Sequence, residues 1–254
     1  NNQIKKLDFK KNKNLFISNF EINKIFDKSE EILKNNNFFI NYPQTQIFKK
    51  NSVDLNCGRH LSIFSKHKII PKFCFNCYKV QITLDKVLDL IKLYFYLSRL
   101  KLEQNNIRKC IVELRDNIAG NYKGYVFCNS ISEAEDIKRI ITNDLKSSNI
   151  NIENVEIKHG CSEYYDEFKI YKNIKENVMD KIYKKEWAEI ERKFDEENYI
   201  LENNKEKVFD ETINLFCLPD LLIMKNWLIY AKIIGDESYK DVYKSEVNTN
   251  HLSQ

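Results

Sequence analysis

Short runs rich in β-branched and aromatic residues, with polar and apolar positions alternating, predict four strands in the middle of the chain. These runs cover residues 78–82, 109–115, 124–128 and 154–158. Two longer segments, residues 84–103 and 133–146, instead repeat apolar residues at intervals of three and four, which is typical of amphipathic helices. The predicted order of elements is strand, helix, strand, strand, helix, strand.

This order of elements is that of a split β-α-β, or ferredoxin-like, unit. In such a unit two right-handed crossovers interleave, and one antiparallel sheet is covered by two helices. We therefore predict an α+β fold with a ferredoxin-like β-α-β-β-α-β core over residues 73–172. Residues 1–72 are predicted to form a basic N-terminal extension with a helix, and residues 173–254 a helical portion that packs on the core.

Helix signals flank this core on both sides. Ser18 and Glu21 have the spacing of a capping box, and the apolar residues after them predict a helix over residues 19–35. Pro219 suits the first turn of a last helix, and Gly235 suits its end. The other elements expected outside the core are a strand at 38–40, extended chain at 61–64, and helices at 174–198 and 205–217.

The charge is spread unevenly along the chain. The net charge of the whole chain is +4, yet residues 1–80 carry 15 Lys and Arg against 6 Asp and Glu. A basic first third favours an anionic partner, such as nucleic acid or an acidic protein surface. The alternative is a solvated lysine-rich surface, because the lysines are scattered rather than clustered.

Composition narrows the class of protein. With 43% hydrophobic residues, a chain of 254 residues can bury a core, and only five glycines and three prolines leave little chain for irregular loops. The chain has no uninterrupted apolar run of about 18 residues, the length that spans a membrane. Seven cysteines, an odd number, and no secretory signal in residues 1–14 predict a cytoplasmic protein with reduced thiols.

Four of the cysteines are predicted to meet at one end of the sheet. Cys74 and Cys77 immediately precede the first core strand, and Cys161 follows the fourth, which should lie beside the first and run the opposite way. Cys57, next to Gly58, can supply a fourth thiolate. Four thiolates favour a tetrahedral structural zinc site.

Other interpretations of these cysteines stay open. The aromatic residues around them also suit an iron–sulfur cluster, and reduced cysteines often pack as small apolar groups without a metal. A redox-active dithiol is a further alternative. His60 and His159 are alternatives to Cys57 as a ligand. We expect Cys110 and Cys128 at the opposite end of the sheet.

The third predicted strand resembles, in part, the RNP1 motif of RNA recognition modules. Its sequence Lys-Gly-Tyr-Val-Phe, residues 123–127, places aromatic residues on the equivalent strand of the same order of elements. Val126 and the residues after the motif depart from the RNP1 pattern. The resemblance implies RNA binding through Lys123, Tyr125 and Phe127, whereas the alternative is that the two aromatic rings pack within the sheet.

These patterns favour a binding function over a catalytic one. The sequence contains no nucleophile elbow, no phosphate-binding glycine loop and no H-E-x-x-H motif, so no catalytic residue is assigned. The acidic residues Glu163, Asp166 and Glu167 are more typical of a solvated loop than of an active site. We therefore expect a zinc-stabilised binding or assembly module for an anionic partner such as RNA. The alternatives are an enzyme with an iron–sulfur cluster or an open metal position at the same cysteines, and a metal-free interaction protein.

Overall fold

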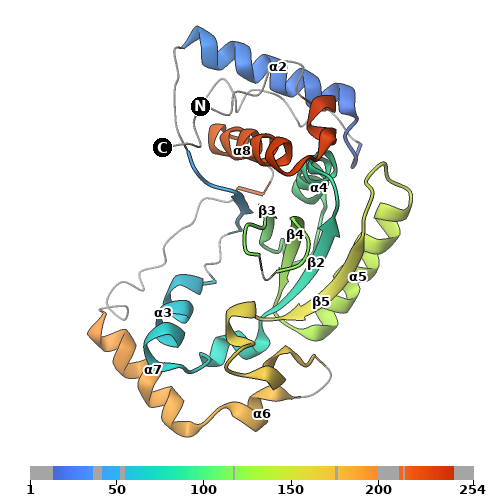
Figure 1. The fold of residues 1–254 in the computed structure, drawn as a ribbon. Coiled ribbons are helices and arrows are strands. Elements are labelled where there is room, and N and C mark those ends of the chain that lie inside the picture. Colours follow the sequence, from blue (N-terminus) through green and yellow to red (C-terminus); the bar gives the residue numbers. More distant parts are fainter. Residues whose placement is uncertain are drawn as a thin grey trace.

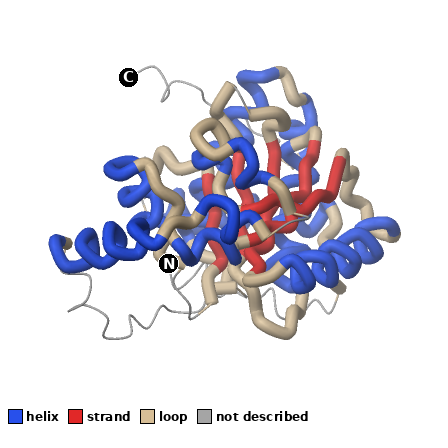
Figure 2. The backbone as a smooth tube through the Cα atoms, turned by 90° about the horizontal axis from the view of Figure 1, so that it is seen from below, coloured by secondary structure: helices blue, strands red, loops and turns tan. Residues whose placement is uncertain are grey.

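The centre of the molecule is a five-stranded sheet, with helices against one of its faces and at both of its ends (Figure 1, Figure 2). The computed structural model describes residues 14–36, 42–51, 55–116, 118–174, 177–198, 212–213 and 215–242. Helices and an antiparallel sheet are both present, so the prediction of an α+β protein is confirmed.

The sheet has the strand order β1-β3-β4-β2-β5, and each neighbouring pair is antiparallel. The strands are β1 (Gln46–Lys49), β2 (Tyr78–Leu84), β3 (Arg108–Val112), β4 (Tyr122–Cys128) and β5 (Asn154–His159). Because β2 lies between β4 and β5, Tyr78 at its start is paired with both Cys128 and His159. The predicted antiparallel pairing of the first and fourth core strands is confirmed.

Two helices cover one face of the sheet. Alternate residues of the central strands point into this layer, and side chains such as Val80 and Ile82 are fully buried there. Gly124 allows the first of the two helices to lie close to β4, because a Cβ atom at this position would clash with the side chain of Leu93. The helices are α4 (Val87–Arg99) and α5 (Ile131–Lys146).

Helices α2 (Asn19–Asn35) and α8 (Leu218–Ile234) lie together at one end of the molecule (Figure 1). The predicted capping box at the start of α2 is confirmed, since the Ser18 side chain and the Glu21 side chain each bind the other's backbone amide. The predicted stop of α8 is also confirmed, because Gly235 takes a left-handed conformation with φ of 81°.

A buried ion pair joins α8 to the sheet. Lys49 Nζ of β1 lies 2.6 Å from Asp220 Oδ2 in the first turn of α8, and both side chains are almost completely buried. The hydroxyl of Tyr94 on α4 donates to the same carboxylate at 3.0 Å. Three elements that are far apart in the sequence therefore meet at one carboxylate.

The opposite end of the molecule has a hydrophobic cluster of its own. It contains buried aromatic side chains, including Phe64, Tyr164, Tyr171 and Trp187. Arg59 ties its helices together by donating to both carboxylate oxygens of Asp195, at 2.5 and 2.7 Å. The helices at this end are α3 (Cys57–His67), α6 (Val178–Ile182) and α7 (Lys185–Glu197).

Several predicted elements differ from the structure. The extended chain expected at 61–64 is wrong, because these residues belong to α3, which buries His60, Ile63 and Phe64 on one face at helical spacing. The single helix expected at 174–198 is interrupted between α6 and α7. Helix α5 is capped by Ser130 and so begins before the predicted residues 133–146. The strand expected at 38–40 and most of the helix expected at 205–217 lie outside the described residues.

Candidate functional site

The face of the sheet opposite α4 and α5 forms the floor of a cleft of about 1030 Å³. The side chains on this face, hereafter the open face, follow from the pairing of the strands. Gln81 of β2 is paired with Tyr125 of β4 and Glu156 of β5, and all three line the cleft. The walls are formed by the start of α3 and by residues 113–115, 118–120 and 160–165.

Aromatic rings and lysines alternate across the open face. The Lys109 ammonium lies 5.2 Å from the ring centroid of Phe48 and 5.6 Å from that of Tyr125. The Lys79 ammonium lies 5.4 Å from the ring centroid of Phe127. These distances are those of cation–π contacts, so a band of three rings and two cations crosses β1, β3, β4 and β2. The band has the composition of a surface that binds a planar anionic ligand.

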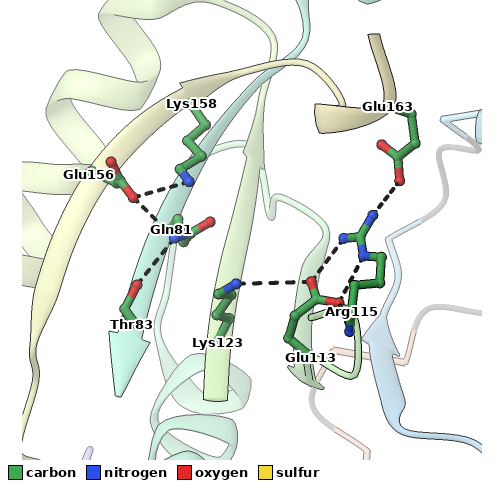
Figure 3. Close-up of polar contacts among 8 residues, drawn as sticks. All are labelled: Gln81, Thr83, Glu113, Arg115, Lys123, Glu156, Lys158 and Glu163. Atoms are coloured by element: carbon green, nitrogen blue, oxygen red, sulfur yellow. Dashed lines mark hydrogen bonds and ion pairs between the residues drawn. The ribbon is translucent and has the colours of Figure 1, made fainter. Parts of the chain in front are cut away.

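One cluster of charged side chains lies beside this band (Figure 3). The Arg115 guanidinium donates to Glu113 at 2.8 Å and to Glu163 at 3.0 Å, and the Lys123 ammonium lies 4.0 Å from Glu113. Hydrogen bonds from Arg115 lower the pKa of Glu113, although burial opposes the shift. The Glu113 carboxylate is thus held in its ionised form, and both carboxylates are paired with the Arg115 cation.

A second cluster occupies the other side of the cleft (Figure 3). The amide nitrogen of Gln81 donates to Thr83 Oγ1 and to Glu156 Oε1, each at 3.1 Å. Lys158 neutralises Glu156 with an N–O distance of 3.2 Å. The polar side chains of this cluster hold one another in fixed positions on β2 and β5.

Lys79 and Lys109 differ from the other cations of the cleft. Among the residues that the structure describes, neither forms an ion pair with a carboxylate, and Lys79 donates to the sulfur of Cys161 at 3.5 Å. Burial lowers the pKa of Lys109 to about 8, and the nearby charge of Lys79 adds to this effect. An anion placed between the two ammonium groups would relieve their repulsion.

The three residues predicted to bind nucleic acid all lie on the open face, at alternate positions of β4. Tyr125 is partly exposed, Phe127 is only 8% exposed, and both line the cleft. Lys123 is only 1% exposed and its ammonium points toward Glu113, so its cation is already engaged (Figure 3). Sequence reasoning missed Phe48, Lys79, Lys109 and Gln81. The signal for these residues was that they occupy alternate positions of neighbouring strands, on the same face as Tyr125.

The four cysteines predicted to bind zinc lie in one region. Cys57 and Cys161 lie close enough to Cys74 and Cys77 for their charges to raise the pKa of both of these thiols. Burial raises the pKa of Cys77 to about 12, with Lys79 opposing the shift and the neighbouring thiols adding to it. The pKa of Cys74 is also raised by burial. Its sulfur lies 3.4 Å from the hydroxyl oxygen of Tyr164.

The described residues contain no group of three or more Cys, His, Asp or Glu side chains arranged to hold a metal ion. The predicted zinc site therefore receives no support from the geometry. His159 is engaged elsewhere, since its Nδ1 and Nε2 lie 2.6 Å and 2.8 Å from the carbonyl oxygens of Tyr171 and Phe75. His60 stacks on Phe73, with ring centroids 5.1 Å apart.

The expectation that Cys110 and Cys128 lie at the opposite end of the sheet is wrong for both residues. Because β4 runs antiparallel to β2, the end of β4 lies beside the start of β2, and Cys128 is paired with Tyr78. Its side chain is buried in the core formed with α4 and α5. Cys110 is paired with Gly124 inside the sheet.

Comparisons with protein-family models, with curated proteins and with solved structures found no match. Within the described residues, no helix combines the length and the apolar character needed to cross a membrane.

Proposed function

We propose that the protein is a non-enzymatic module that binds single-stranded RNA in the cleft on the open face of its sheet. The observation that carries this proposal is the band of Phe48, Tyr125 and Phe127 with Lys79 and Lys109 between the rings. Proteins that bind single strands combine aromatic platforms for the bases with cations that follow the phosphates. The open face supplies both.

The charge balance of the cleft favours an anionic ligand. The carboxylates of Glu113, Glu163 and Glu156 are each paired with a cation of the protein. Lys79 and Lys109 are not paired in this way within the described part of the chain, so their charges are available to phosphate groups. The cleft thus has positive charge where its aromatic rings lie.

The size and shape of the cleft favour a short stretch of a single strand. Small-molecule pockets have volumes of about 300–1,000 Å³, and this cleft slightly exceeds that range at about 1030 Å³. Bases stack on aromatic side chains only when they are unpaired and splayed out, so a duplex is not the expected ligand. A strand of a few nucleotides fits both the volume and the spacing of the rings.

We also propose that residues 73–172 form a ferredoxin-like core. In its favour, β2, α4, β3, β4, α5 and β5 follow one another in the predicted order, and their strands are arranged as β3-β4-β2-β5. Strand β1 extends this sheet beside β3 and adds Phe48 to the open face. All seven cysteines are free thiols, which fits a reducing compartment, and we propose the cytoplasm.

Fluorescence anisotropy with labelled single-stranded RNA of about ten nucleotides tests the RNA proposal. We expect binding that weakens as salt rises from about 50 mM to about 200 mM, because phosphate contacts release counterions. Tyr125→Leu should weaken binding about tenfold or more, since each stacked base contributes about 1–3 kcal/mol. The control is Lys146→Met, at the exposed end of α5 on the far side of the sheet.

Binding tests with two further ligands, duplex RNA and free mononucleotides, show which class of ligand the cleft prefers. Duplex RNA of the same length should bind weakly, and free mononucleotides should not compete at concentrations similar to those of the RNA. No binding of single strands even at about 50 mM salt would refute the proposal. Tight binding of mononucleotides alone would replace it with a small-molecule function.

A structural zinc ion at Cys57, Cys74, Cys77 and Cys161 is a separate proposal, favoured only by the mutual proximity of these thiols. Elemental analysis of the purified protein tests it. About one zinc ion per chain, lost in Cys74→Ser, would support the site. A brown protein with iron would instead support the alternative of an enzyme with an iron–sulfur cluster. If the protein contains neither metal at a significant level, the cysteines are thiols without a metal ion.

A further inference from the structure

The side-chain amide of Gln81 has a fixed orientation on the floor of the cleft. Its nitrogen donates to Thr83 Oγ1 and Glu156 Oε1, and the residue is only 4% exposed. A carboxylate accepts hydrogen bonds and cannot donate them, so the group that faces Glu156 must be the NH₂. Both hydrogens of the amide are therefore used, and the amide cannot turn over without losing the bond to Glu156.

The carbonyl oxygen of Gln81 is left facing the other way. Figure 3 shows it on the side away from Glu156, toward β4. No donor among the described residues forms a hydrogen bond with this oxygen, and Gln81 lines the cleft. This oxygen is not one of the buried side-chain atoms that lack a partner, so it is open to the cleft, where a donor group of a ligand can bind it.

The place of Gln81 in the sheet aligns it with a stacked base. It is paired directly with Tyr125 across β2 and β4, and paired residues on one face of a sheet have Cβ atoms about 4.5–5.5 Å apart. The ring of Tyr125 is flanked on its other side by Lys109 of β3. A base on this ring would have its phosphate near Lys109 and its edge near Gln81.

We propose that Gln81 makes the cleft prefer cytosine and adenine, which carry an amino donor at pyrimidine position 4 or purine position 6, over uracil, which presents a carbonyl oxygen at the corresponding position. The inference rests on the proposed RNA-binding function and adds base selectivity to it. The carbonyl of Gln81 accepts from the amino group of cytosine or adenine, whereas the uracil oxygen would face an acceptor. One neutral hydrogen bond that forms with cytosine or adenine and not with uracil corresponds to a ratio of affinities of roughly tenfold.

Equilibrium binding of cytidine and uridine oligonucleotides of about ten nucleotides to the full chain tests the inference. The two pyrimidines have nearly the same size, and they differ in the group at the position that Gln81 contacts. A difference in affinity therefore does not arise from size. Gln81→Met removes the acceptor while it keeps the length and neutrality of the side chain. The matched control is Gln46→Met, an exposed glutamine of β1 that lines the same cleft.

The expected result is that the protein binds the cytidine strand roughly tenfold more tightly than the uridine strand. Gln81→Met should lower the cytidine affinity and bring the two affinities together, because the amino group loses its acceptor and the uracil oxygen no longer faces one, whereas Gln46→Met keeps the preference. Equal binding of both strands by the unmodified protein would overturn the role of Gln81 and leave RNA binding intact.

Two other outcomes would also overturn the inference. If Gln81→Met weakened both strands equally, with an unchanged melting temperature, Gln81 would hold the site without reading a base. If neither strand bound at about 50 mM salt, the RNA-binding function would fail and base selectivity with it. An adenosine strand provides an independent check, and it should behave like the cytidine strand.

Discussion

Raising the pH from about 7 to about 9 should weaken RNA binding about tenfold through a single group, Lys109. Burial and the charge of Lys79 lower the pKa of Lys109 to about 8, although Glu113, Glu163 and Cys161 oppose the shift. In the free protein, the charged fraction of Lys109 then falls from about nine-tenths to about one-tenth over this range. A bound phosphate favours the charged lysine, so the affinity falls in proportion to the charged fraction.

The assay is anisotropy with a cytidine oligonucleotide, because cytosine loses no proton between these two pH values whereas uracil begins to. Lys109→Arg keeps a permanent charge and should remove most of the fall. Lys109→Met should bind weakly at both pH values. The control Lys146→Met should keep the full pH dependence of the unmodified protein.

The reasoning would be refuted by an affinity that stays constant between about pH 7 and about pH 9 in the unmodified protein. It would equally be refuted by a Lys109→Met variant that still loses affinity about tenfold over the same range, because another group would then be titrating.

Three predictions concern the stability of the free protein. Lys109 has a lowered pKa, so its charged form disfavours folding below about pH 8. Lys109→Met should therefore raise the free energy of unfolding in urea at about pH 7, by on the order of 2 kcal/mol, and an unchanged value would contradict this. Asp220→Ala leaves the buried Lys49 ammonium without its carboxylate and should cost about 3–5 kcal/mol in the same assay; a loss near zero would exclude the ion pair. Gly124→Val should lower the melting temperature, because its side chain meets Leu93 of α4, and an unchanged temperature would show that α4 does not pack as described.

Features that depend on residues close together in the sequence were predicted correctly. The capping box of Ser18 and Glu21 and the stop at Gly235 depend on residues within one turn of the helix end, and both are confirmed. The strands and helices of the core were predictable because their apolar periodicity is long. The extended chain expected at 61–64 was wrong because Ile63 and Phe64 are also compatible with a short helix, and packing decides between the two.

The site depends on contacts that no local pattern encodes. Phe48 reaches the cleft only because β1 pairs with β3, a contact between residues about sixty positions apart in the sequence. Lys109 and Gln81 belong to strands that do not touch, and β4 between them brings both beside Tyr125. The motif-like residues of β4 were found from the sequence, whereas their cationic partners, Lys79 and Lys109, required the register of β2 and β3 against β4.

Ultraviolet cross-linking of single-stranded RNA to the full chain, followed by mass spectrometry of the peptides, tests the central claim most directly. If the open face binds RNA, the cross-linked peptides should include residues 122–128 of β4, and Tyr125→Leu should remove that cross-link. Cross-links confined to α5 on the opposite side of the sheet, or none at low salt, would contradict it.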